Sequence, residues 1–260
     1  RTFYRMAVIN AIEERLVTRL RKAQTCLALT GAGVSQESGI PTFRDAQTGL
    51  WAKFYPKELA TPDAFQKDPK MVWQWYEYRR GIIRQTRPHP AHYALAQLES
   101  LFPEFWLITQ NIDGLHQLAG SKRIIELHGN IFRNKCSKEG RPVEEIPKGE
   151  DVPPKCPVCG GYLRPDVVWF NEPLPEEEIT RSIDLSSRCQ AFLVIGTSAV
   201  VYTAAHLPVA AKRSGACLIE INTSPTPVTD YADFTLLGKA GEILPKLVED
   251  LKRDKGQSTI

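Results

Sequence analysis

The sequence predicts an α/β fold, in which a doubly wound parallel sheet carries a small zinc-ribbon-like insert and a helical insert. Short apolar runs alternate with segments of helical periodicity, which is the pattern of buried strands covered by helices. Between residues 132 and 165 the hydrophobicity falls and three cysteines appear, so this part needs a metal to hold it. The 260 residues, 42% of them hydrophobic and 24% charged, are enough for one large domain with such inserts.

Each element follows from its own pattern. Apolar positions at helical spacing predict a first helix over residues 8–21. Four apolar runs predict buried strands at residues 25–30, 105–110, 191–195 and 217–221. Helical segments lie between them, for example at residues 90–101 and 204–212, and the polar tail from residue 252 is expected to fray.

Charge and cysteine content exclude several classes of protein. The formal net charge is +3, from 33 basic and 30 acidic residues, and no basic stripe of the kind that binds nucleic acid is present. No apolar run reaches the length of a membrane span, and the first residues lack the apolar block of a secretory signal. Six cysteines without such a signal favour metal or redox use over a disulfide framework.

The first strand leads into a glycine-rich turn, G-A-G-V-S, which begins at Gly31. A strand followed by such a turn and a helix start brings backbone N–H groups to a pyrophosphate. The usual dinucleotide fingerprint is absent, because Gly39 follows Gly33 by six residues and no acidic residue stands where a ribose is bound. No lysine completes a P-loop either. The pattern still favours a nucleotide site over a plain tight turn.

Other strand ends carry small or polar residues. Residues 196–198, G-T-S, follow one strand and Asn222 follows the next. Ligands of open α/β sheets bind at the carboxyl ends of the strands, so these ends are consistent with one elongated cofactor. Residues 110–113, Q-N-I-D, can turn a polar face into a cleft, and His128 in L-H-G suits a buried ring. The other histidines are interpreted as satisfied core or surface groups: His89, His92, His116 and His206.

Taken together, these motifs resemble the sirtuin family. The resemblance covers residues 23–247 and is carried, in order, by G-A-G-V-S-x-x-S-G-I-P-x-F-R, T-Q-N-I-D, L-H-G, C-P-x-C-G-G-x-L-R-P-x-V-V-W-F, G-T-S and I-N. Sirtuins are NAD-dependent protein-lysine deacylases with a Rossmann-like large domain and a smaller zinc-bearing domain. The resemblance implies a Rossmann-like NAD-binding domain from residues 1–43, 87–132 and 166–260, a cofactor loop with a helical insert at 44–86, and a metal-binding insert at 133–165.

The resemblance also assigns roles to the matching residues. His128 would be the general base, with Asn111 and Asp113 as further catalytic residues. The substrate-binding set is Tyr76, Arg79, Val167, Val168, Trp169 and Phe170. Of these, residues 167–170 would clamp the substrate backbone and form the wall of the acyl-lysine tunnel. The cofactor-binding set is Gly31, Ala32, Gly33, Ser35, Pro41, Phe43, Arg44, Trp51, Gln110, Asn111, Ile112, Asp113, Gly196, Thr197, Ser198, Asn222, Thr223 and Ala240.

The implied reaction is a group transfer rather than a hydride transfer. The acyl oxygen attacks the ribose carbon that bears nicotinamide, nicotinamide leaves, and an alkylimidate forms. His128 then helps to deprotonate a ribose hydroxyl that attacks the imidate, and water releases lysine and O-acyl-ADP-ribose. A histidine with a pKa near neutrality suits this step, and an apolar wall of Phe43, Val167 and Trp169 would exclude water.

The pair C-P-V-C, formed by Cys156 and Cys159, has the spacing of a tetrahedral zinc knuckle. Sirtuins supply a second C-x-x-C upstream; Cys136 begins it here, but Glu139 stands at the position of the fourth cysteine. We expect one structural zinc on at least the three cysteines, with Glu139 as a candidate fourth ligand. A water as fourth ligand, a weakened site and an insert without metal are the alternatives. Three further cysteines are interpreted as buried apolar residues: Cys26, Cys189 and Cys217.

The segment W-Q-W-Y-E-Y-R-R, residues 73–80, places Tyr76 and Arg79 three positions apart, on one helix face. A phenol and a guanidinium on one face can bind a carboxylate together. The segment resembles class III sirtuins, whose Y-x-x-R reads the carboxylate of succinyl-, malonyl- or glutaryl-lysine, and Trp73 would lie on the packed side. In the alternative, Tyr76 packs, Arg79 is solvated and the enzyme is a plain deacetylase.

We therefore expect an NAD-dependent deacylase that acts on acylated lysines of proteins and removes acetyl and acidic acyl groups. A mono-ADP-ribosyltransferase is an alternative, which the intact V-V-W-F and His128 argue against. A non-catalytic NAD or acyl-lysine sensor would predict loss of His128, Asn111 or Asp113, and all three are present. We expect a monomer without a direct nucleic-acid or membrane partner, and the short terminal extensions, which resemble prokaryotic sirtuins, favour the cytoplasm.

Overall fold

A six-stranded parallel sheet forms the centre of the larger part of the protein. The computed structural model describes residues 12–41, 55–147, 149, 151–198 and 202–253. The strand order is β3-β2-β1-β7-β8-β9, and every neighbouring pair is parallel. The strands are β1 Thr25–Thr30, β2 Glu104–Thr109, β3 Ile124–Glu126, β7 Ala191–Ile195, β8 Cys217–Asn222 and β9 Phe234–Leu237. The predicted α/β fold with a parallel sheet is confirmed.

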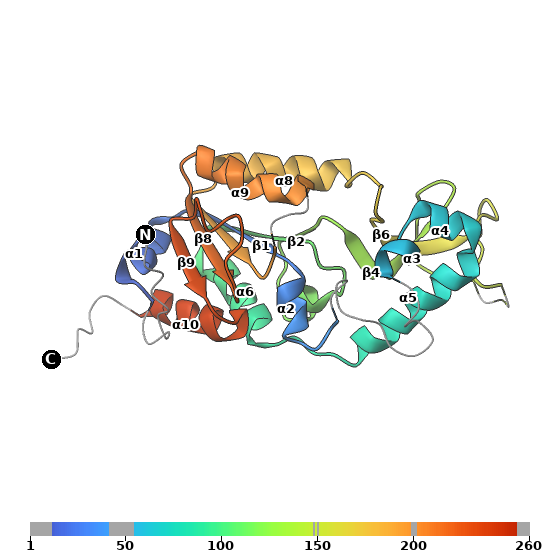
Figure 1. The fold of residues 1–260 in the computed structure, drawn as a ribbon, viewed down its shortest axis with the longest axis horizontal. Helices are drawn as coiled ribbons and strands as arrows, with labels where there is room; N and C mark the ends of the chain where they lie inside the picture. Colours follow the sequence, from blue (N-terminus) through green and yellow to red (C-terminus); the bar gives the residue numbers. More distant parts are fainter. Residues whose placement is uncertain (1–11, 42–54, 148, 150, 199–201, 254–260) are drawn as a thin grey trace.

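Helices cover both faces of this sheet (Figure 1). One face packs against α1 Glu14–Lys22, α6 Pro90–Leu101 and α10 Ala240–Lys252, and the other against α8 Glu176–Arg188 and α9 Tyr202–Arg213. In the central strand β1, successive side chains point alternately to the two faces of the sheet. Cys26 and Ala28 belong to the first core cluster, and Leu27 and Leu29 belong to the second. A strand buried on both faces is a continuous apolar run, which is why its bounds are readable from the sequence.

A smaller antiparallel sheet and three helices form the other end of the molecule (Figure 1). The strand order is β5-β4-β6, with β4 Gly129–Cys136, β5 Pro142–Val143 and β6 Leu163–Val167. The helices are α3 Pro56–Leu59, α4 Pro62–Lys67 and α5 Pro69–Arg84. Trp75 and Tyr76 of α5 share a core cluster with Val167 of β6, so helices and sheet form one packed unit. The Asp68 side chain caps α5 by accepting the Met71 N–H at 2.9 Å.

Several element bounds differ from the sequence predictions. Strand β2 begins one residue earlier than residue 105, and β8 extends to Asn222. The first helix begins at Glu14, while residues 8–11 lie outside the described part of the chain. Strands β3 and β9 were missed because they are only 3 and 4 residues long and each includes a polar residue. The two short helices α2 Ala32–Gln36 and α7 Leu115–Leu118 follow β1 and β2.

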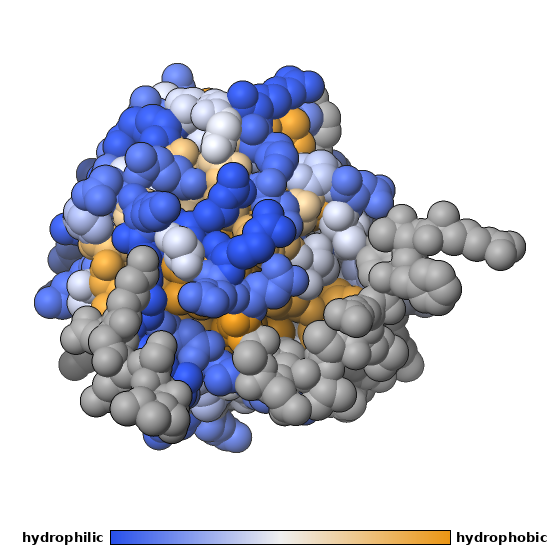
Figure 2. All heavy atoms as spheres, turned by 90° about the vertical axis from the view of Figure 1, so that its left-hand side faces the viewer, coloured by the Kyte–Doolittle hydropathy of each residue, from blue (hydrophilic) through white to orange (hydrophobic). Residues whose placement is uncertain are grey.

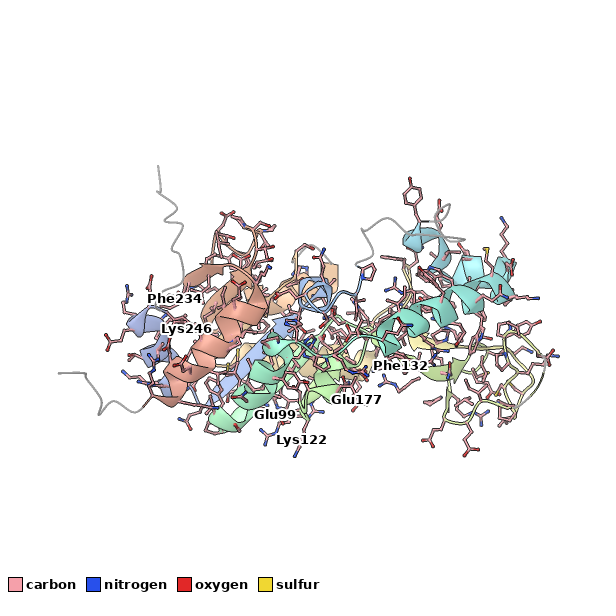
Figure 3. The ribbon with its side chains drawn as sticks, turned by 90° about the horizontal axis from the view of Figure 1, so that it is seen from below. Glu99, Lys122, Phe132, Glu177, Phe234 and Lys246 are labelled. Carbon is pink, nitrogen blue, oxygen red and sulfur yellow. The ribbon has the colours of Figure 1, made fainter. Side chains whose placement is uncertain are left out.

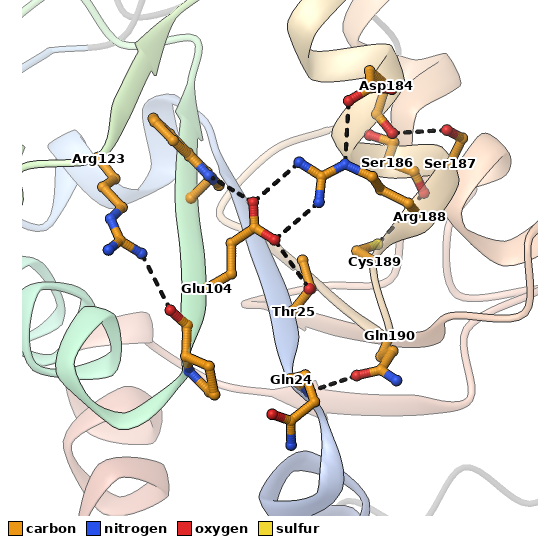
Figure 4. A network of polar contacts seen from close by, with 12 residues as sticks. Gln24, Thr25, Glu104, Arg123, Asp184, Ser186, Ser187, Arg188, Cys189 and Gln190 are labelled. Carbon is orange, nitrogen blue, oxygen red and sulfur yellow. Dashed lines mark hydrogen bonds and ion pairs between the residues drawn. The ribbon is translucent and has the colours of Figure 1, made fainter.

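At the ends of the strands remote from their carboxyl termini, a polar network ties the sheet to α8. Arg188 donates two hydrogen bonds to Glu104, at 2.9 and 3.0 Å, and the Thr25 hydroxyl donates to Glu104 at 3.2 Å (Figure 4). Arg188 also donates to Asp184 one helical turn earlier, at 3.2 Å. Thr25 and Glu104 are the first residues of β1 and β2, so this network lies away from the carboxyl edge.

The helices of the described residues are not of the kind that spans a membrane. None of the helices found there combines the length and the apolar character that crossing a bilayer requires. The end of the molecule seen in Figure 2 is mainly hydrophilic, with smaller hydrophobic areas between the polar side chains.

Candidate active site

The loops that follow β1 and β7 touch so closely that both require glycine. The N–H of Gly31 donates to the oxygen of Ile195 at 3.1 Å, and the N–H of Gly33 donates to the oxygen of Gly196 at 2.8 Å. A Cβ on Gly31 would lie 2.6 Å from the Thr197 Cβ, and a Cβ on Gly33 would lie 2.8 Å from the Gly196 oxygen. Any side chain would therefore force the two loops apart. The glycines bring both loops together at the carboxyl edge of the sheet.

A cavity of about 430 Å³ opens beside these loops. Its lining residues are Gly33, Gln36, Glu37, Gly196, Ile221, Asn222, Thr223, Gly238, Lys239 and Ala240. Five predicted cofactor positions thus share one cavity: Gly33, Gly196, Asn222, Thr223 and Ala240. The other five were not in the predicted cofactor set, since no local pattern distinguishes them: Gln36, Glu37, Ile221, Gly238 and Lys239.

The carboxylate of Glu37 fixes one wall of this cavity. It accepts the N–H groups of Ala240 at 2.8 Å and Gly241 at 3.0 Å, the first two residues of α10. The first N–H groups of a helix have no partner within the helix, and a carboxylate there also interacts favourably with the helix dipole. The segment after α2 and the start of α10 are therefore held together around the cavity.

Thr197 joins three of the strand ends. Its hydroxyl accepts from the side-chain amide of Gln110 at 3.0 Å, and its backbone oxygen accepts from the amide of Asn222 at 2.9 Å. These bonds bring together the segments after β2 and β7 and the last residue of β8. Ser198 is half-buried beside them, and Ala32 and Pro41 are exposed. The predicted positions Phe43, Arg44 and Trp51 lie outside the described residues.

Asn111 and Asp113 attach to the glycine-rich turn. The Asn111 amide donates to the oxygen of Gly31 at 2.9 Å, and the Ser35 hydroxyl donates to Asp113 at 2.5 Å. Asp113 also accepts the N–H of Leu115 at 2.9 Å. Burial raises the pKa of Asp113, and the hydrogen bond from Ser35 opposes that rise. Both side chains are buried, whereas Ile112 between them is half-buried and packs against the core of the smaller part.

His128 lies half-buried between β3 and β4, with its ring anchored to the neighbouring strand end. Its Nδ1 is 2.9 Å from the backbone oxygen of Gln110. Burial lowers the pKa of His128, and the hydrogen bond to Gln110 partly opposes this effect. Its backbone oxygen accepts the N–H of Val168 at 2.9 Å, and Gly129 follows with φ of 76°, where a Cβ would overlap the Asp166 oxygen. Ring and backbone are therefore both tied to neighbouring segments.

The segment V-V-W-F runs beside His128. Val167 and Trp169 are buried, Val168 is half-buried and Phe170 is exposed. The N–H of Trp169 donates to the carboxylate of Glu172 at 2.8 Å. The N–H groups on either side donate to the backbone oxygens of His128 and Ala60, each at 2.9 Å. The backbone N–H groups of residues 168–170 are therefore all bonded within the protein.

Tyr76 and Arg79 share one face of α5, as predicted, and that face is turned inward. Tyr76 is fully buried, and its hydroxyl oxygen accepts the indole N–H of Trp169 at 2.9 Å. Burial raises the pKa of Tyr76. Arg79 is half-buried, with its guanidinium carbon 5.3 Å from the ring centroid of Trp75. Burial lowers the pKa of Arg79, while the neighbouring Tyr76 and Asp113 act in the opposite direction.

The neighbouring Arg80, which the sequence analysis did not single out, is the deeply buried arginine of this helix at 2% exposure. It donates to the oxygen of Ile131 at 2.6 Å, to Asn134 at 2.7 Å and to Glu77 at 2.5 Å. Its guanidinium carbon lies 5.2 Å from the centroid of Trp73, which packs toward the cysteines. Arg80 is thus a structural link between α5 and β4.

The three predicted metal ligands meet in space. The sulfur atoms of Cys136, Cys156 and Cys159 all lie within 4.8 Å of one another, and those of Cys136 and Cys159 are 3.3 Å apart. Tetrahedral zinc with Zn–S bonds of about 2.3 Å requires sulfur separations of this order. The N–H groups of Cys159 and Val158 lower the pKa of Cys156 to about 7, which favours the thiolate that binds metal. The donor set therefore fits zinc.

Glu139 does not join this group. Its carboxylate forms an ion pair with Arg141 on the exposed turn that follows Cys136, and it is not among the residues whose ligand atoms gather there. Our candidate for a fourth ligand is therefore not supported by the geometry, because the turn carries the side chain outward to a nearby cation. The cysteines assigned to the core, Cys26, Cys189 and Cys217, are buried as predicted.

Comparisons with known proteins agree with this geometry. The model of the Sir2 family matches residues 31–203. NAD-dependent protein deacylase 2 of Pyrobaculum aerophilum is 51% identical over 240 residues, which cover 90% of this chain and 94% of that protein. The NAD-dependent protein deacylase of Aquifex aeolicus is 50% identical over 231 residues, covering 88% of this chain and 96% of that protein.

Solved structures show the same fold. A Sir2 homologue in complex with NAD matches with a TM-score of 0.85 and 45% identity, covering 93% of this chain and 94% of the other. A Sir2 protein with a p53 peptide and NAD⁺ matches with a TM-score of 0.81 and 33% identity, covering 92% and 98%. The fold, the residues at the strand ends and these similarities have one explanation: this chain belongs to the Sir2 family.

Proposed function

We propose that this protein is an NAD-dependent protein-lysine deacylase that removes acetyl groups and acidic acyl groups such as succinyl and malonyl. Support for deacylation comes from the gathering of Asn111, Asp113 and His128 beside the loop that begins at Gly31. Relatives about half identical to this chain carry the name NAD-dependent protein deacylase. The products would be nicotinamide, deacylated lysine and O-acyl-ADP-ribose.

The glycine-rich turn and the cavity suit NAD. Gly31 and Gly33 let the loop after β1 pack directly on the loop after β7, and the cavity that opens beside both loops, near Asn222, has room for the adenosine half. Bound NAD would supply the ribose carbon that receives the acyl oxygen, with nicotinamide as the leaving group. Asn111 and Asp113, held by the turn through Gly31 and Ser35, would orient the ribose and nicotinamide end.

His128 would act as the general base. Its Nδ1 faces a carbonyl oxygen, which only accepts, so Nδ1 carries the proton and Nε2 is left with a lone pair. A neutral ring with a free Nε2 can take the proton from a ribose hydroxyl. The lowered pKa of His128 keeps the ring in this neutral form at pH 7. Buried Val167 and Trp169 would keep water away from the reacting atoms.

The acidic-acyl preference rests on one observation, the hydrogen bond between Tyr76 and Trp169. Because the Tyr76 oxygen accepts the indole N–H, its own O–H remains for donation to a bound acyl group. The raised pKa of Tyr76 keeps that proton in place. Arg79, on the same helix face, adds a permanent positive charge. A phenol donor beside a guanidinium matches the terminal carboxylate of a succinyl or malonyl group.

The test compares acetyl- and succinyl-lysine peptides of one sequence, with NAD, for the wild type and Arg79→Met. Loss of a charged hydrogen bond should reduce kcat/KM for the succinyl peptide by about 10- to 100-fold and spare the acetyl peptide. Arg84→Met is the matched control, because Arg84 is exposed at the end of α5 with its guanidinium carbon 5.7 Å from the Phe132 ring. Phe132 of β4 is labelled in Figure 3.

Each alternative predicts a different result. If the succinyl peptide is not turned over, or if Arg79→Met leaves the ratio of the two activities unchanged, the protein is a plain deacetylase. If nicotinamide is released at the full rate with a protein acceptor but without any acyl peptide, it is a mono-ADP-ribosyltransferase. Arg84→Met should match the wild type on both peptides.

A further inference from the structure

An ion pair between the buried Arg164 and the half-buried Glu172 supports the V-V-W-F segment. Arg164 of β6 donates to the carboxylate of Glu172 at 2.5 and 2.9 Å, and their side chains are 8% and 22% exposed. Arg164 also donates to the oxygen of Val167 at 2.9 Å. Neither residue has been assigned a role above, although both flank the proposed substrate segment in the chain.

The ion pair holds Trp169 by both its backbone and its ring. The same Glu172 oxygen that binds Arg164 accepts the Trp169 N–H at 2.8 Å. The guanidinium carbon of Arg164 lies 3.2 Å from the centroid of the indole, in stacking contact. The ring of Phe65 contacts the same indole with a centroid distance of 5.2 Å. The indole orientation is therefore determined by a planar cation, a carboxylate and an aromatic neighbour.

This orientation is transmitted to Tyr76. The ring planes of Trp169 and Tyr76 are 28° apart, with centroids at 6.4 Å, and the indole N–H donates to the Tyr76 oxygen. An indole N–H is a donor only, so this contact has one direction. It leaves the hydroxyl proton of Tyr76 to point away from Trp169. A small rotation of the indole would remove that constraint and let the hydroxyl turn.

Stability alone is a poor explanation for the ion pair. Withdrawing Arg164, and in part Glu172, from water costs desolvation free energy that their attraction offsets only with good geometry, and apolar residues of similar volume often stabilise a protein equally well. Arginine supplies what an apolar residue cannot: a flat, stacking group that also carries a fork of donors. The contacts of Arg164 use each of these properties toward Trp169, Glu172 and the backbone.

We propose that Arg164 and Glu172 are positioning residues of the acyl-lysine pocket. They hold the Trp169 indole so that its N–H orients the Tyr76 hydroxyl toward the acyl group. This inference rests on the proposed function, which makes Trp169 a wall of the acyl-lysine tunnel and Tyr76 a reader of the acyl group. Arg164 itself does not contact the substrate in this proposal: its two terminal nitrogens donate to Glu172 and Val167, and its Nε is buried without a hydrogen-bond partner among the described residues.

The experiment uses Arg164→Met, Arg164→Lys and Glu172→Gln in the full chain, with acetyl and succinyl peptides and NAD. Arg164→Met should raise KM for the acetyl peptide about tenfold, the change that about 1.4 kcal/mol of lost binding produces, and raise KM for the succinyl peptide further. NAD affinity, measured by calorimetry, should not change. Arg164→Lys keeps the charge but loses the planar group that stacks on the indole, so its acyl-peptide KM should be raised as in Arg164→Met.

A second readout follows Trp169 without using activity. The indole ¹⁵N–¹H resonance of Trp169, assigned through Trp169→Phe, should shift in Arg164→Met, which removes the stacked cation, and in Glu172→Gln, which removes the charge that holds this cation in place. Arg188→Met is the control: it removes an arginine that binds Glu104 and Asp184 at the far end of the sheet (Figure 4). It should change neither KM nor the Trp169 resonance.

The outcomes separate this inference from the proposed function. A wild type that deacylates peptides, with unchanged acyl-peptide KM in Arg164→Met, overturns the positioning role alone. Parallel losses in NAD affinity and acyl-peptide KM also overturn it, since they indicate a general structural defect. A wild type that deacylates no peptide overturns the proposed function and this inference with it. If Arg164→Met does not fold, the acyl-peptide KM and the Trp169 resonance of Glu172→Gln decide between the outcomes. This variant should fold, because the amide oxygen can still accept the Trp169 N–H.

Discussion

The ring of His128 is bound through Nδ1 to the backbone oxygen of Gln110, at 2.9 Å. This one contact selects the tautomer, because the carbonyl oxygen can only accept and the proton must be on Nδ1. It also joins the segment after β3 to the residue after β2, so the proposed base is oriented by the same strand end that carries Asn111 and Asp113. A change at the ring should therefore affect proton transfer without disturbing the cofactor loops.

Replacing His128 with alanine should remove the proposed base and leave the loops after β1 and β7 intact. We expect kcat for an acetyl peptide to fall by about 10²- to 10⁴-fold, the usual contribution of a general base. NAD affinity measured by calorimetry should be retained, because the ring is bonded to Gln110 rather than to the turn at Gly31. A fall in kcat of less than about tenfold would show that another group accepts the proton.

The acidic limb of the pH profile should report His128. Burial lowers its pKa below the ordinary value of about 6.5, so the ring is still neutral where an exposed histidine is half protonated. As the pH falls through the lowered pKa, the ring is protonated and kcat/KM is lost. The measurement is kcat/KM from pH 5 to 8 with a peptide that does not titrate in that range; a midpoint above about 6.5 would contradict the lowered pKa.

Ser35→Ala should weaken NAD binding through Asp113. The Ser35 hydroxyl donates to the buried Asp113 carboxylate and opposes the rise in its pKa that burial causes. Without that bond the pKa of Asp113 rises further, and the charged form, which we propose orients the ribose, becomes less populated. We expect KM for NAD to rise about tenfold, as for a lost hydrogen bond to a charged group.

The control for that change is Ser38→Ala, three residues further along. The Ser38 hydroxyl is buried without a hydrogen-bond partner among the described residues, so its loss removes no contact seen there. An equal rise in KM for NAD in both variants would show that the effect comes from disturbing the turn, not from Asp113.

Zinc removal should destabilise the smaller part of the protein. We expect about one zinc per chain and a lower melting temperature after chelation, since the insert around Cys136, Cys156 and Cys159 has little other core. Cys156→Ser should lower the zinc content, and Cys189→Ala, at a buried site in the core of the large sheet, should not. Wild-type protein prepared with zinc that still contains none would contradict the metal site.

His92→Asn should make the protein more resistant to acid. Burial is the main cause that lowers the pKa of His92 to about 2, with His116 beside it, whereas an unfolded histidine titrates near about 6.5. Between these values the unfolded chain binds more protons, so the free energy of unfolding falls as the pH drops below about 6.5, by up to about 1.4 kcal/mol per pH unit.

The His92→Asn variant removes this pH-dependent contribution and keeps the contact. The oxygen of the introduced amide can accept the backbone N–H of His89, which now donates to His92 Nδ1 at 3.2 Å. Urea unfolding at pH 7 and pH 5 should show a smaller loss of stability in the variant than in the wild type. Equal losses would contradict the prediction, and His206→Asn, at an exposed position on α9, controls for the substitution itself.

Much of the large sheet could be predicted because its strands are buried on both faces. The expected strands at 25–30 and 191–195 match β1 and β7, since each is a continuous apolar run bounded by turn residues. The glycines at Gly31 and Gly33 were also readable, because their spacing after a strand is a local feature. The short strands β3 and β9 were missed because a local pattern needs length to stand out.

Local patterns in the chain were sufficient for the parallel sheet, the glycine-rich turn, the cysteine group and the pairing of Tyr76 with Arg79 on one helix face. Three-dimensional packing was needed to establish that Glu139 turns to Arg141, that Arg80 is buried, and that Trp169 bonds to Tyr76 across 93 positions of the chain. Periodicity and spacing report which side of an element is buried. Which distant side chain packs against that buried side depends on how β6 and α5 pack, and no local sequence pattern encodes that packing.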